Sequence, residues 1–197
     1  MAEPLSEAAR EQLFSGAHTH NGWTSDRITE KTMRALYDLM KWPPTSFNCS
    51  PARLVFVVTK MEKERLRPML METNQEKSMA APATVIVAYD KRFYEHLPDI
   101  FPAMEGVDAL FSGNEDFAEQ TAFRNSSIQG GYFILAARAL GLDCGPMSGF
   151  DSAAVDKAYF PDGRFTANFL CNIGYGDPEG IHPRSPRLDF EKACQIV

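Results

Sequence analysis

The sequence predicts an α+β fold in which large helices flank a mixed sheet. Two runs rich in β-branched and apolar residues, Arg53 to Thr59 and Ala83 to Tyr89, are typical of strands. Their nearly continuous apolar character predicts burial on both faces. A third strand is predicted from Ala167 to Tyr175, because the turn Gly176-Asp177-Pro178 follows it. The stretch from Asn114 to Leu140 keeps helical spacing of its apolar residues and predicts the longest helix.

Capping residues and helix breakers predict the other elements. Further helices are expected from Ser6 to Gly16, from Thr29 to Met40, from Met61 to Ala80 with an interruption at Pro68, and from Asp151 to Tyr159. The segment from Pro98 to Gly113 carries prolines, glycines and aromatic residues that we expect to be exposed, and it predicts a long loop or lid. The tail from Ile181 is expected to be extended.

Small residues interrupt the longest predicted helix. Ser126-Ser127 and Gly130-Gly131 lie within it, and Gly141 stands where a C-terminal cap belongs. Each glycine costs about 1 kcal/mol relative to alanine inside a helix. Two interpretations stay open: a locally weak helix, or the close approach of a ligand or a second subunit.

Length, charge and cysteine spacing limit the possible classes of protein. The 197 residues, 44% of them hydrophobic, suit a single domain from residue 1 to 197. A net charge of −6 disfavours binding to duplex nucleic acid. No apolar run is long enough to cross a membrane, and the first residues lack the features of a signal peptide, so we expect a cytoplasmic protein.

The cysteines and histidines indicate no metal site. Four widely spaced cysteines contain no Cys-x-x-Cys pair and are expected to be reduced thiols; they are Cys49, Cys144, Cys171 and Cys194. The histidines lack the spacing of metal ligands. Neither a Gly-x-Gly-x-x-Gly motif after a strand nor a Gly-x-Ser-x-Gly elbow is present, which disfavours a Rossmann domain and a serine hydrolase.

The segment from Trp42 to Pro51 is the most informative one. Pro43 and Pro44 stop the preceding helix, because proline lacks the N–H group that a helix needs. Polar side chains then follow on a short, stiff connector that leads into a strand. A connector of this kind between rigid elements is a good place to hold a polar ligand.

Five segments together resemble the flavin-dependent nitroreductases. They are Thr19 to Trp23, Pro44 to Pro51, Asn74 to Lys77, Leu140 to Asp151, and Arg184 to Arg187. Runs such as Thr-His-Asn-Gly-Trp and Gly-Pro-Met-Ser-Gly-Phe-Asp are similar to the subgroup that contains the malonic semialdehyde reductases of pyrimidine breakdown.

The resemblance implies a fold and an activity. The implied fold has a mainly antiparallel sheet flanked by helices, with an extended C-terminal tail exchanged in a homodimer. The implied enzyme binds FMN and transfers a hydride from NAD(P)H through flavin N5 to a small-molecule acceptor, by a ping-pong mechanism. The subgroup implies reduction of malonic semialdehyde to 3-hydroxypropionate.

The resemblance also implies which residues contact FMN. The connector would bond the ribityl chain, phosphate or ring edge through Thr45, Ser46 and Asn48. The backbone at Pro146, Met147, Ser148 and Gly149 would approach flavin N5 and O4, with N–H donors from the three residues after the proline and close contact permitted by the glycine. The N1/O2/N3 edge would meet Asn74 and Lys77, and Lys77 would oppose the negative charge of the reduced ring. The phosphate would meet Arg184 and Arg187.

The N-terminal motif departs from the family pattern. Most relatives have arginines where this sequence has Ala17-His18-Thr19-His20-Asn21. Thr19 can still bond the cofactor, Asn21 can contact the ring edge, and His18 can meet phosphate when it is protonated. Arg124 on the long helix is a candidate to bind a substrate carboxylate, since its guanidinium is bidentate; an ion pair within or between subunits is the alternative.

Each of these residue sets also has a plain structural interpretation: a helix-ending turn, a solvated lysine, an ordinary loop or an exposed basic tail. Three other functions therefore stay open. They are a general nitro- or quinone reductase, a flavin-binding or ligand-sensing protein without turnover, and a structural domain without a ligand.

Overall fold

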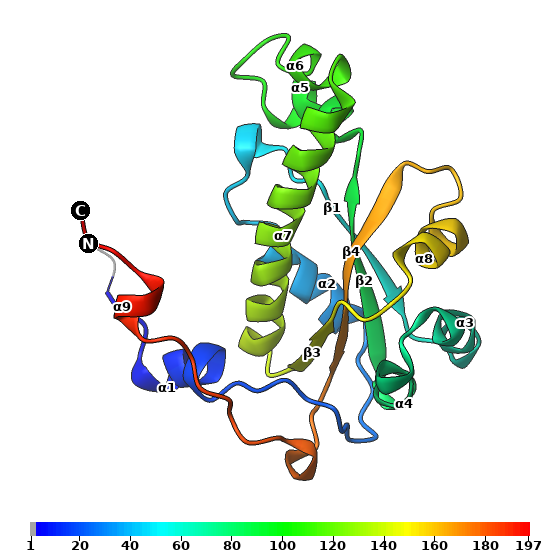
Figure 1. The fold of residues 1–197 in the computed structure, drawn as a ribbon, viewed down its shortest axis with the longest axis vertical. Coiled ribbons are helices and arrows are strands. Elements are labelled where there is room, and N and C mark those ends of the chain that lie inside the picture. The colour runs from blue at the N-terminus through cyan, green and yellow to red at the C-terminus, as the bar shows by residue number, and fades with distance from the viewer. Residues whose placement is uncertain (1–2) are drawn as a thin grey trace.

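The computed structural model describes residues 3–197, which build an antiparallel sheet of strand order β1-β2-β4-β3 (Figure 1). The strands are β1 (Ala52–Val57), β2 (Ala83–Asp90), β3 (Asp143–Met147) and β4 (Phe165–Gly174). All eight residues of β2 are buried, as its apolar run predicts. β1 is the edge strand of the sheet, and five of its six residues are only half-buried. The prediction of burial on both faces is therefore wrong for this strand.

β3 was not predicted from the sequence. Its residues Gly145 and Pro146 are typical of a loop, and no pattern in the sequence predicts a strand there. The structure pairs Pro146 with Cys171 of β4, in a strand that lies at the other edge of the sheet. Proline is tolerated there because an edge strand does not need every N–H group.

Helices cover both faces of the sheet (Figure 1). On one face lie α2 (Glu30–Met40) and the long α7 (Glu115–Ala139), over a core that includes Val85 and Val87. On the other lie α3 (Lys60–Leu66), α4 (Glu72–Ala80) and α8 (Ser152–Tyr159), over a core that includes Ile86 and Ala88. Successive residues of β2 thus point to opposite cores, as the two-residue period of a strand requires.

The predicted helix ends are confirmed by their caps. Ser6 begins α1 (Glu7–Arg10), which continues as the π-helical turn Glu11–Ser15. Thr29, Asn114 and Asp151 each accept a backbone N–H at the start of α2, α7 and α8. Gly141 follows α7 with a φ of +75°, the left-handed conformation that glycine adopts without strain.

The two adjacent glycines of α7 differ in their surroundings. A Cβ at Gly130 would lie 2.4 Å from Cε1 of Phe169 on β4, so this glycine lets the helix approach the sheet closely. A Cβ at Gly131 would meet nothing within 4 Å. Within one chain, packing therefore explains Gly130 but not Gly131.

The segment from Pro98 to Gly113 is not a free loop. It contains most of α5 (Leu97–Ile100) and all of α6 (Ala109–Ser112). Phe111 and Val107 are buried in a third core at the N-terminal end of α7, so the prediction of exposed aromatics is wrong for Phe111. Phe111 is buried because it packs in an aromatic cluster, in which the ring centroids of Phe111 and Phe93 lie 4.9 Å apart.

The remaining helical elements are short. They are the 3₁₀ turns Ser46–Asn48, Arg67–Met69, Phe93–His96 and Pro178–Gly180, and α9 (Phe190–Ala193). The helices α1 and α9, close to the two ends of the described chain, lie on the same side of the molecule (Figure 1). Within residues 3–197, no helix is long and apolar enough to cross a membrane, and no cluster of acidic, cysteine or histidine side chains suits a metal ion. All four cysteines are free thiols.

Candidate functional site

Helix α4 brings Asn74 to the segment that follows β3 and carries Lys77 three residues further on. The Asn74 amide is buried, and its Nδ2 donates to the carbonyl oxygen of Gly149 at 2.8 Å. The backbone N–H of Met71 donates to the same oxygen at 3.0 Å. A Cβ at Gly149 would lie only 2.5 Å from Asn74 Nδ2, so this contact needs glycine.

The N-terminal segment runs along the start of β3. Thr19 bridges to Cys144 in parallel fashion, and the N–H of His20 donates to the Cys144 carbonyl at 3.0 Å. Trp23 Nε1 then donates to the carbonyl of Lys77 at 3.1 Å, which ties this segment to α4. The result is a cavity of about 620 Å³, lined by Asn21, Thr73, Glu76, Lys77, Ala80 and His182.

His20 and Trp23 were singled out only as parts of a motif, and the structure shows what they do. The His20 ring is buried, and its Nε2 lies 3.2 Å from Asp143 Oδ1. The other carboxylate oxygen of Asp143 accepts from the N–H of Gly176 at 2.9 Å. His20 therefore clamps the N-terminal segment against β3 and the turn after β4, while the His18 side chain is half-buried.

The two tail arginines behave differently. Arg184 donates from Nη2 to the carbonyls of Ser15 and Ala17, at 2.7 and 2.8 Å. This contact brings the tail beside His18, so the two predicted phosphate contacts share a region. Arg187 instead donates to Ser185 and Pro186 of its own tail.

The connector after α2 lies apart from α4, on the other side of the sheet (Figure 1). Ser46 N–H donates to Asn125 Oδ1 of α7 at 2.9 Å, and Thr45 Oγ1 accepts from the N–H of Ser50 at 3.2 Å. Asn48 Nδ2 donates to the Ile100 carbonyl at 2.7 Å. The hydroxyl of Thr45 thus bonds within the turn, the amide of Asn48 bonds to α5, and one chain does not bring this segment to Lys77.

Comparison with known proteins decides the family. The model of the nitroreductase family matches residues 15–175. The chain belongs to the nitroreductase family. A Cupriavidus pinatubonensis protein, provisionally named an NADH dehydrogenase/NAD(P)H nitroreductase, is 57% identical over 189 residues, 95% of this chain and 96% of that protein. A Polynucleobacter asymbioticus protein with the same provisional name is 52% identical over the full length of both chains.

Solved nitroreductase structures share the fold. A Bacillus subtilis protein provisionally described as a nitroreductase superposes with a TM-score of 0.87 at 24% identity, over 98% of this chain and 100% of that one. An Exiguobacterium sibiricum protein with the same provisional description, crystallised with FMN, superposes with a TM-score of 0.85 at 19% identity over all of both chains. The predicted nitroreductase-like α+β fold is confirmed.

Arg124 of this nitroreductase lies on the outward face of α7. Its side chain is exposed, and no ion pair among the described residues includes it. An intrahelical ion pair, the structural alternative, is therefore absent from the part of the chain that the structure describes. Four other exposed residues of α7 are aromatic or aliphatic, with exposed fractions of 40% to 52%: Phe117, Phe123, Ile128 and Tyr132.

Lys63 is a buried cation that the sequence did not single out. Its Nζ donates to the carbonyl oxygen of Ser78 at 2.8 Å and to that of Ala81, at the C-terminal end of α4. The ammonium therefore stabilises the end of the helix that carries Asn74 and Lys77. Burial lowers the pKa of Lys63 from 10.5 to about 8.

We expect this pKa to appear in the pH dependence of stability. Between pH 8 and 10.5 the unfolded state binds more protons at Lys63 than the folded state, so the free energy of unfolding contributed by this site rises with pH. From pH 7 to pH 10, the free energy of unfolding of the wild type, measured in urea, should rise by roughly 1–3 kcal/mol relative to that of Lys63→Met. Lys60→Met, at an exposed position of the same helix, should show no such gain. A pH-independent difference between wild type and Lys63→Met would contradict this assignment.

Proposed function

We propose that the protein is an FMN-dependent NAD(P)H oxidoreductase that acts by ping-pong hydride transfer in a homodimer of one-domain subunits. One observation carries the proposal: Asn21 and Lys77, from segments far apart in the sequence, line one cavity, and Asn74 of the helix that carries Lys77 donates to Gly149 just after β3. The FMN complex of the Exiguobacterium sibiricum protein and the NAD(P)H nitroreductase names of the close relatives support the same cofactors. The free thiols suit a reducing, cytoplasmic compartment.

The polar side chains of the cavity and of α4 fit the polar edge of a flavin. The amides of Asn21, which lines the cavity, and of Asn74, which lies on the same helix as Lys77, can both donate and accept, and the Lys77 ammonium donates only. A flavin edge with carbonyl oxygens and one N–H group needs this mixture. Gly149 leaves open the space beside Asn74 that a Cβ would fill. When bound, FMN supplies hydride acceptance from NAD(P)H and hydride donation to the acceptor at N5.

The protein groups would then have distinct roles. Lys77 would oppose the negative charge that the reduced ring acquires, and it is only half-buried, so it can reach the cavity. The backbone at Pro146, Met147, Ser148 and Gly149 would line the ring near N5. At the phosphate end of FMN, His18 and Thr19 would contact the phosphate together with Arg184. The Arg187 side chain would join them after it releases its hydrogen bonds to the carbonyls of Ser185 and Pro186.

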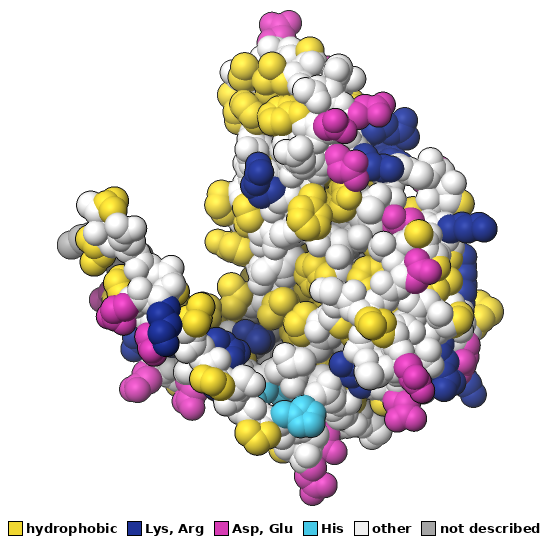
Figure 2. Space-filling model, viewed as in Figure 1, with side chains coloured by type: hydrophobic (Ala, Val, Ile, Leu, Met, Phe, Trp, Pro, Cys, Tyr) yellow, Lys and Arg dark blue, Asp and Glu magenta, His cyan; other side chains and the backbone are white. Residues whose placement is uncertain are grey.

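Three features favour a homodimer. The connector with Thr45 and Ser46 lies across the sheet from α4, so a second copy is needed to bring both to one flavin. Gly131 and the apolar residues around it on α7 face outward. Figure 2 shows hydrophobic side chains gathered over the concave face between the projecting chain ends and the body. Exposed apolar surface of this kind marks an interaction site.

The open edge of β1 favours exchange of the C-terminal tail. A groove of about 870 Å³ lies along this edge and is lined in part by Tyr37, Leu54 and Phe56. The chain becomes extended after α9, where Cys194 has a φ of −133° and a ψ of 152°. An extended segment can add to an exposed sheet edge through main-chain hydrogen bonds. We infer that the tail of one subunit occupies this groove of the other.

The proposed acceptor is malonic semialdehyde, which would be reduced to 3-hydroxypropionate. Arg124 supports this choice, because an exposed guanidinium without an ion-pair partner can bind a small carboxylate. A general nitro- or quinone reductase is the second candidate, since Phe117 and Phe123 lie exposed on the same helix and could stack on an aromatic acceptor.

We expect Arg124→Ala to separate these two acceptors. Loss of a charge-assisted bond worth about 1.5–3 kcal/mol should raise KM for malonic semialdehyde by roughly 10- to 100-fold. KM for a neutral quinone should change less than about threefold on the same scale. Arg124→Lys, which keeps the charge but loses the bidentate fork, should lie between. Equal effects of Arg124→Ala on both acceptors would remove Arg124 from substrate binding.

An anaerobic titration tests the catalytic function itself. The FMN-loaded protein should lose its visible flavin absorbance on addition of NADH or NADPH and recover it with malonic semialdehyde or a nitroaromatic. Recovery with only one acceptor identifies the substrate class. Full flavin occupancy without reduction by either nicotinamide would instead identify a non-catalytic flavin-binding protein.

A further inference from the structure

The turn after α2 holds three residues with left-handed backbone conformations. Their φ angles are 50° at Phe47, 52° at Asn48 and 38° at Ser50. Asparagine tolerates this region, whereas a bulky residue such as phenylalanine is an outlier there. Strained residues of this kind persist only where their surroundings hold them.

The contacts that hold the strained pair come from the segment Pro98 to Gly113. The Phe47 ring packs edge-to-face on Phe101 and Phe111, with centroids 5.8 and 6.0 Å apart. Asn48 Nδ2 donates to the carbonyl oxygen of Ile100 at 2.7 Å. The middle of the turn is thus attached to a different element from its ends.

The ends of the turn are attached to α7. Ser46 N–H donates to Asn125 Oδ1, and the N–H of Ala52 donates to Gln129 Oε1 at 2.8 Å. Both amide side chains are buried, with exposed fractions of 4%. The backbone of the turn has two hydrogen bonds of its own, from Asn48 N–H to the Thr45 carbonyl and from Cys49 N–H to the Ser46 carbonyl, both at 2.9 Å. The side chains of Phe47 and Asn48 are therefore the groups that join the middle of the turn to the segment from Pro98 to Gly113.

We propose that Phe47 and Asn48 form a latch that fixes this segment to the turn carrying Thr45 and Ser46. Asn48 is then a positioning residue, which acts through Ile100, and not a contact of FMN. The segment from Pro98 to Gly113 is therefore held in one position by the turn, whereas its composition predicts a mobile loop or lid. The proposal rests on the proposed function in one measurement only, that of FMN affinity. The hydrogen-exchange measurements use the flavin-free protein and do not depend on it.

Hydrogen exchange tests the latch in the flavin-free protein. Asn48→Gly keeps a residue that accepts a positive φ and removes only the amide. Amide exchange within residues 98–113 should rise roughly 3- to 10-fold, the change that loss of one ordinary hydrogen bond produces in a local opening equilibrium. Exchange in β2 should not change, whereas a general loss of stability would raise it there too.

Three further variants sharpen the test. Asn48→Asp keeps the size of the side chain but cannot donate to the Ile100 carbonyl, so it should act like Asn48→Gly. Phe47→Leu loses the edge-to-face contacts and should raise exchange in the same segment. Ser50→Gly is the matched control, because it relieves a positive φ in the same turn without touching the latch, and exchange at 98–113 should stay at the wild-type value.

The outcome that overturns the latch is unchanged exchange at 98–113 in Asn48→Gly and Phe47→Leu. A raised Kd for FMN in Asn48→Gly with unchanged exchange would do the same, since it marks Asn48 as a ligand contact. Failure of the wild-type protein to bind FMN would overturn the proposed function and leave the exchange result to decide the latch.

Discussion

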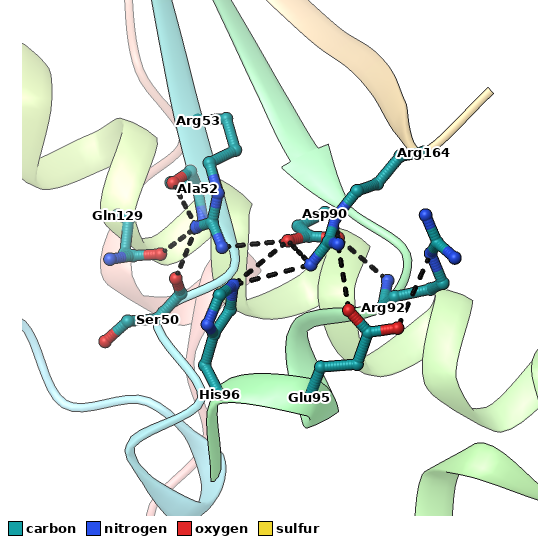
Figure 3. A network of polar contacts seen from close by, with 9 residues as sticks. All are labelled: Ser50, Ala52, Arg53, Asp90, Arg92, Glu95, His96, Gln129 and Arg164. Carbon is teal, nitrogen blue, oxygen red and sulfur yellow. Dashed lines mark hydrogen bonds and ion pairs between the residues drawn. The ribbon is translucent and has the colours of Figure 1, made fainter. Parts of the chain in front are cut away.

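Asp90→Ala should destabilise the fold by about 3 kcal/mol, the low end of the cost of removing one partner from a buried ion pair. The Asp90 side chain is fully buried at the end of β2, where two guanidinium groups converge on it (Figure 3). Arg53 Nη2 donates to it at 2.9 Å, and Arg164 donates to both carboxylate oxygens at 3.0 Å. Without the carboxylate these partly buried cations lose their main counter-charge, although Glu95 still pairs with Arg164 at 2.8 Å.

Urea unfolding of wild type and variant measures this effect. Asp38→Ala is the matched control, because Asp38 pairs with Lys41 on the surface and should contribute less than about 0.5 kcal/mol. A loss below about 1 kcal/mol in Asp90→Ala would show that the network around Asp90 is not a major source of stability. The network matters for the site as well, since His96 of the same cluster immediately precedes α5 and the latched segment.

Gly149→Val should weaken FMN binding by roughly 10- to 100-fold, equal to about 1.4–2.8 kcal/mol. A Cβ at this position would lie 2.5 Å from Asn74 Nδ2 and 2.8 Å from Met71 Sδ. The Asn74 amide must then give up its bond to the Gly149 carbonyl and move away from the segment after β3. Folding should suffer less than FMN binding, because the exposed Met71 side chain can move outward.

Fluorescence titration of FMN measures this loss, and the free energy of unfolding of the flavin-free protein serves as the internal check. Gly113→Ala is the control, since a Cβ there meets nothing within 4 Å. If Gly149→Val binds FMN as tightly as wild type, the segment from Pro146 to Gly149 does not belong to the flavin site.

Local signals in the sequence were enough for most elements. β2 was predicted from the apolar, β-branched run Ala83 to Tyr89, and α7 from the helical spacing of its apolar residues, with Gly141 marking its C-terminal end. β3 was missed because Gly145 and Pro146 disfavour a strand locally, and its backbone is held by pairing with β4, which is distant in the sequence. Long-range pairing of this kind leaves no local pattern.

The candidate site was predictable to the extent that it resembles a family. The motif residues Asn74 and Gly149 are in contact, and Asn21 and Lys77 line one cavity. The sequence could not show that Asn48 donates to Ile100, because that bond depends on a left-handed turn that Phe47 disfavours. Nor could it show that the connector lies across the sheet from α4, since that separation arises only from the packing of α2 and α7.

Native mass spectrometry of the purified, FMN-loaded protein tests the central claim most directly, that one flavin site needs residues from two copies of the chain. The account predicts a dimer with two bound FMN molecules, which loses its FMN when diluted to the monomer. A monomer that keeps FMN at full affinity, or a dimer that binds none, would contradict it.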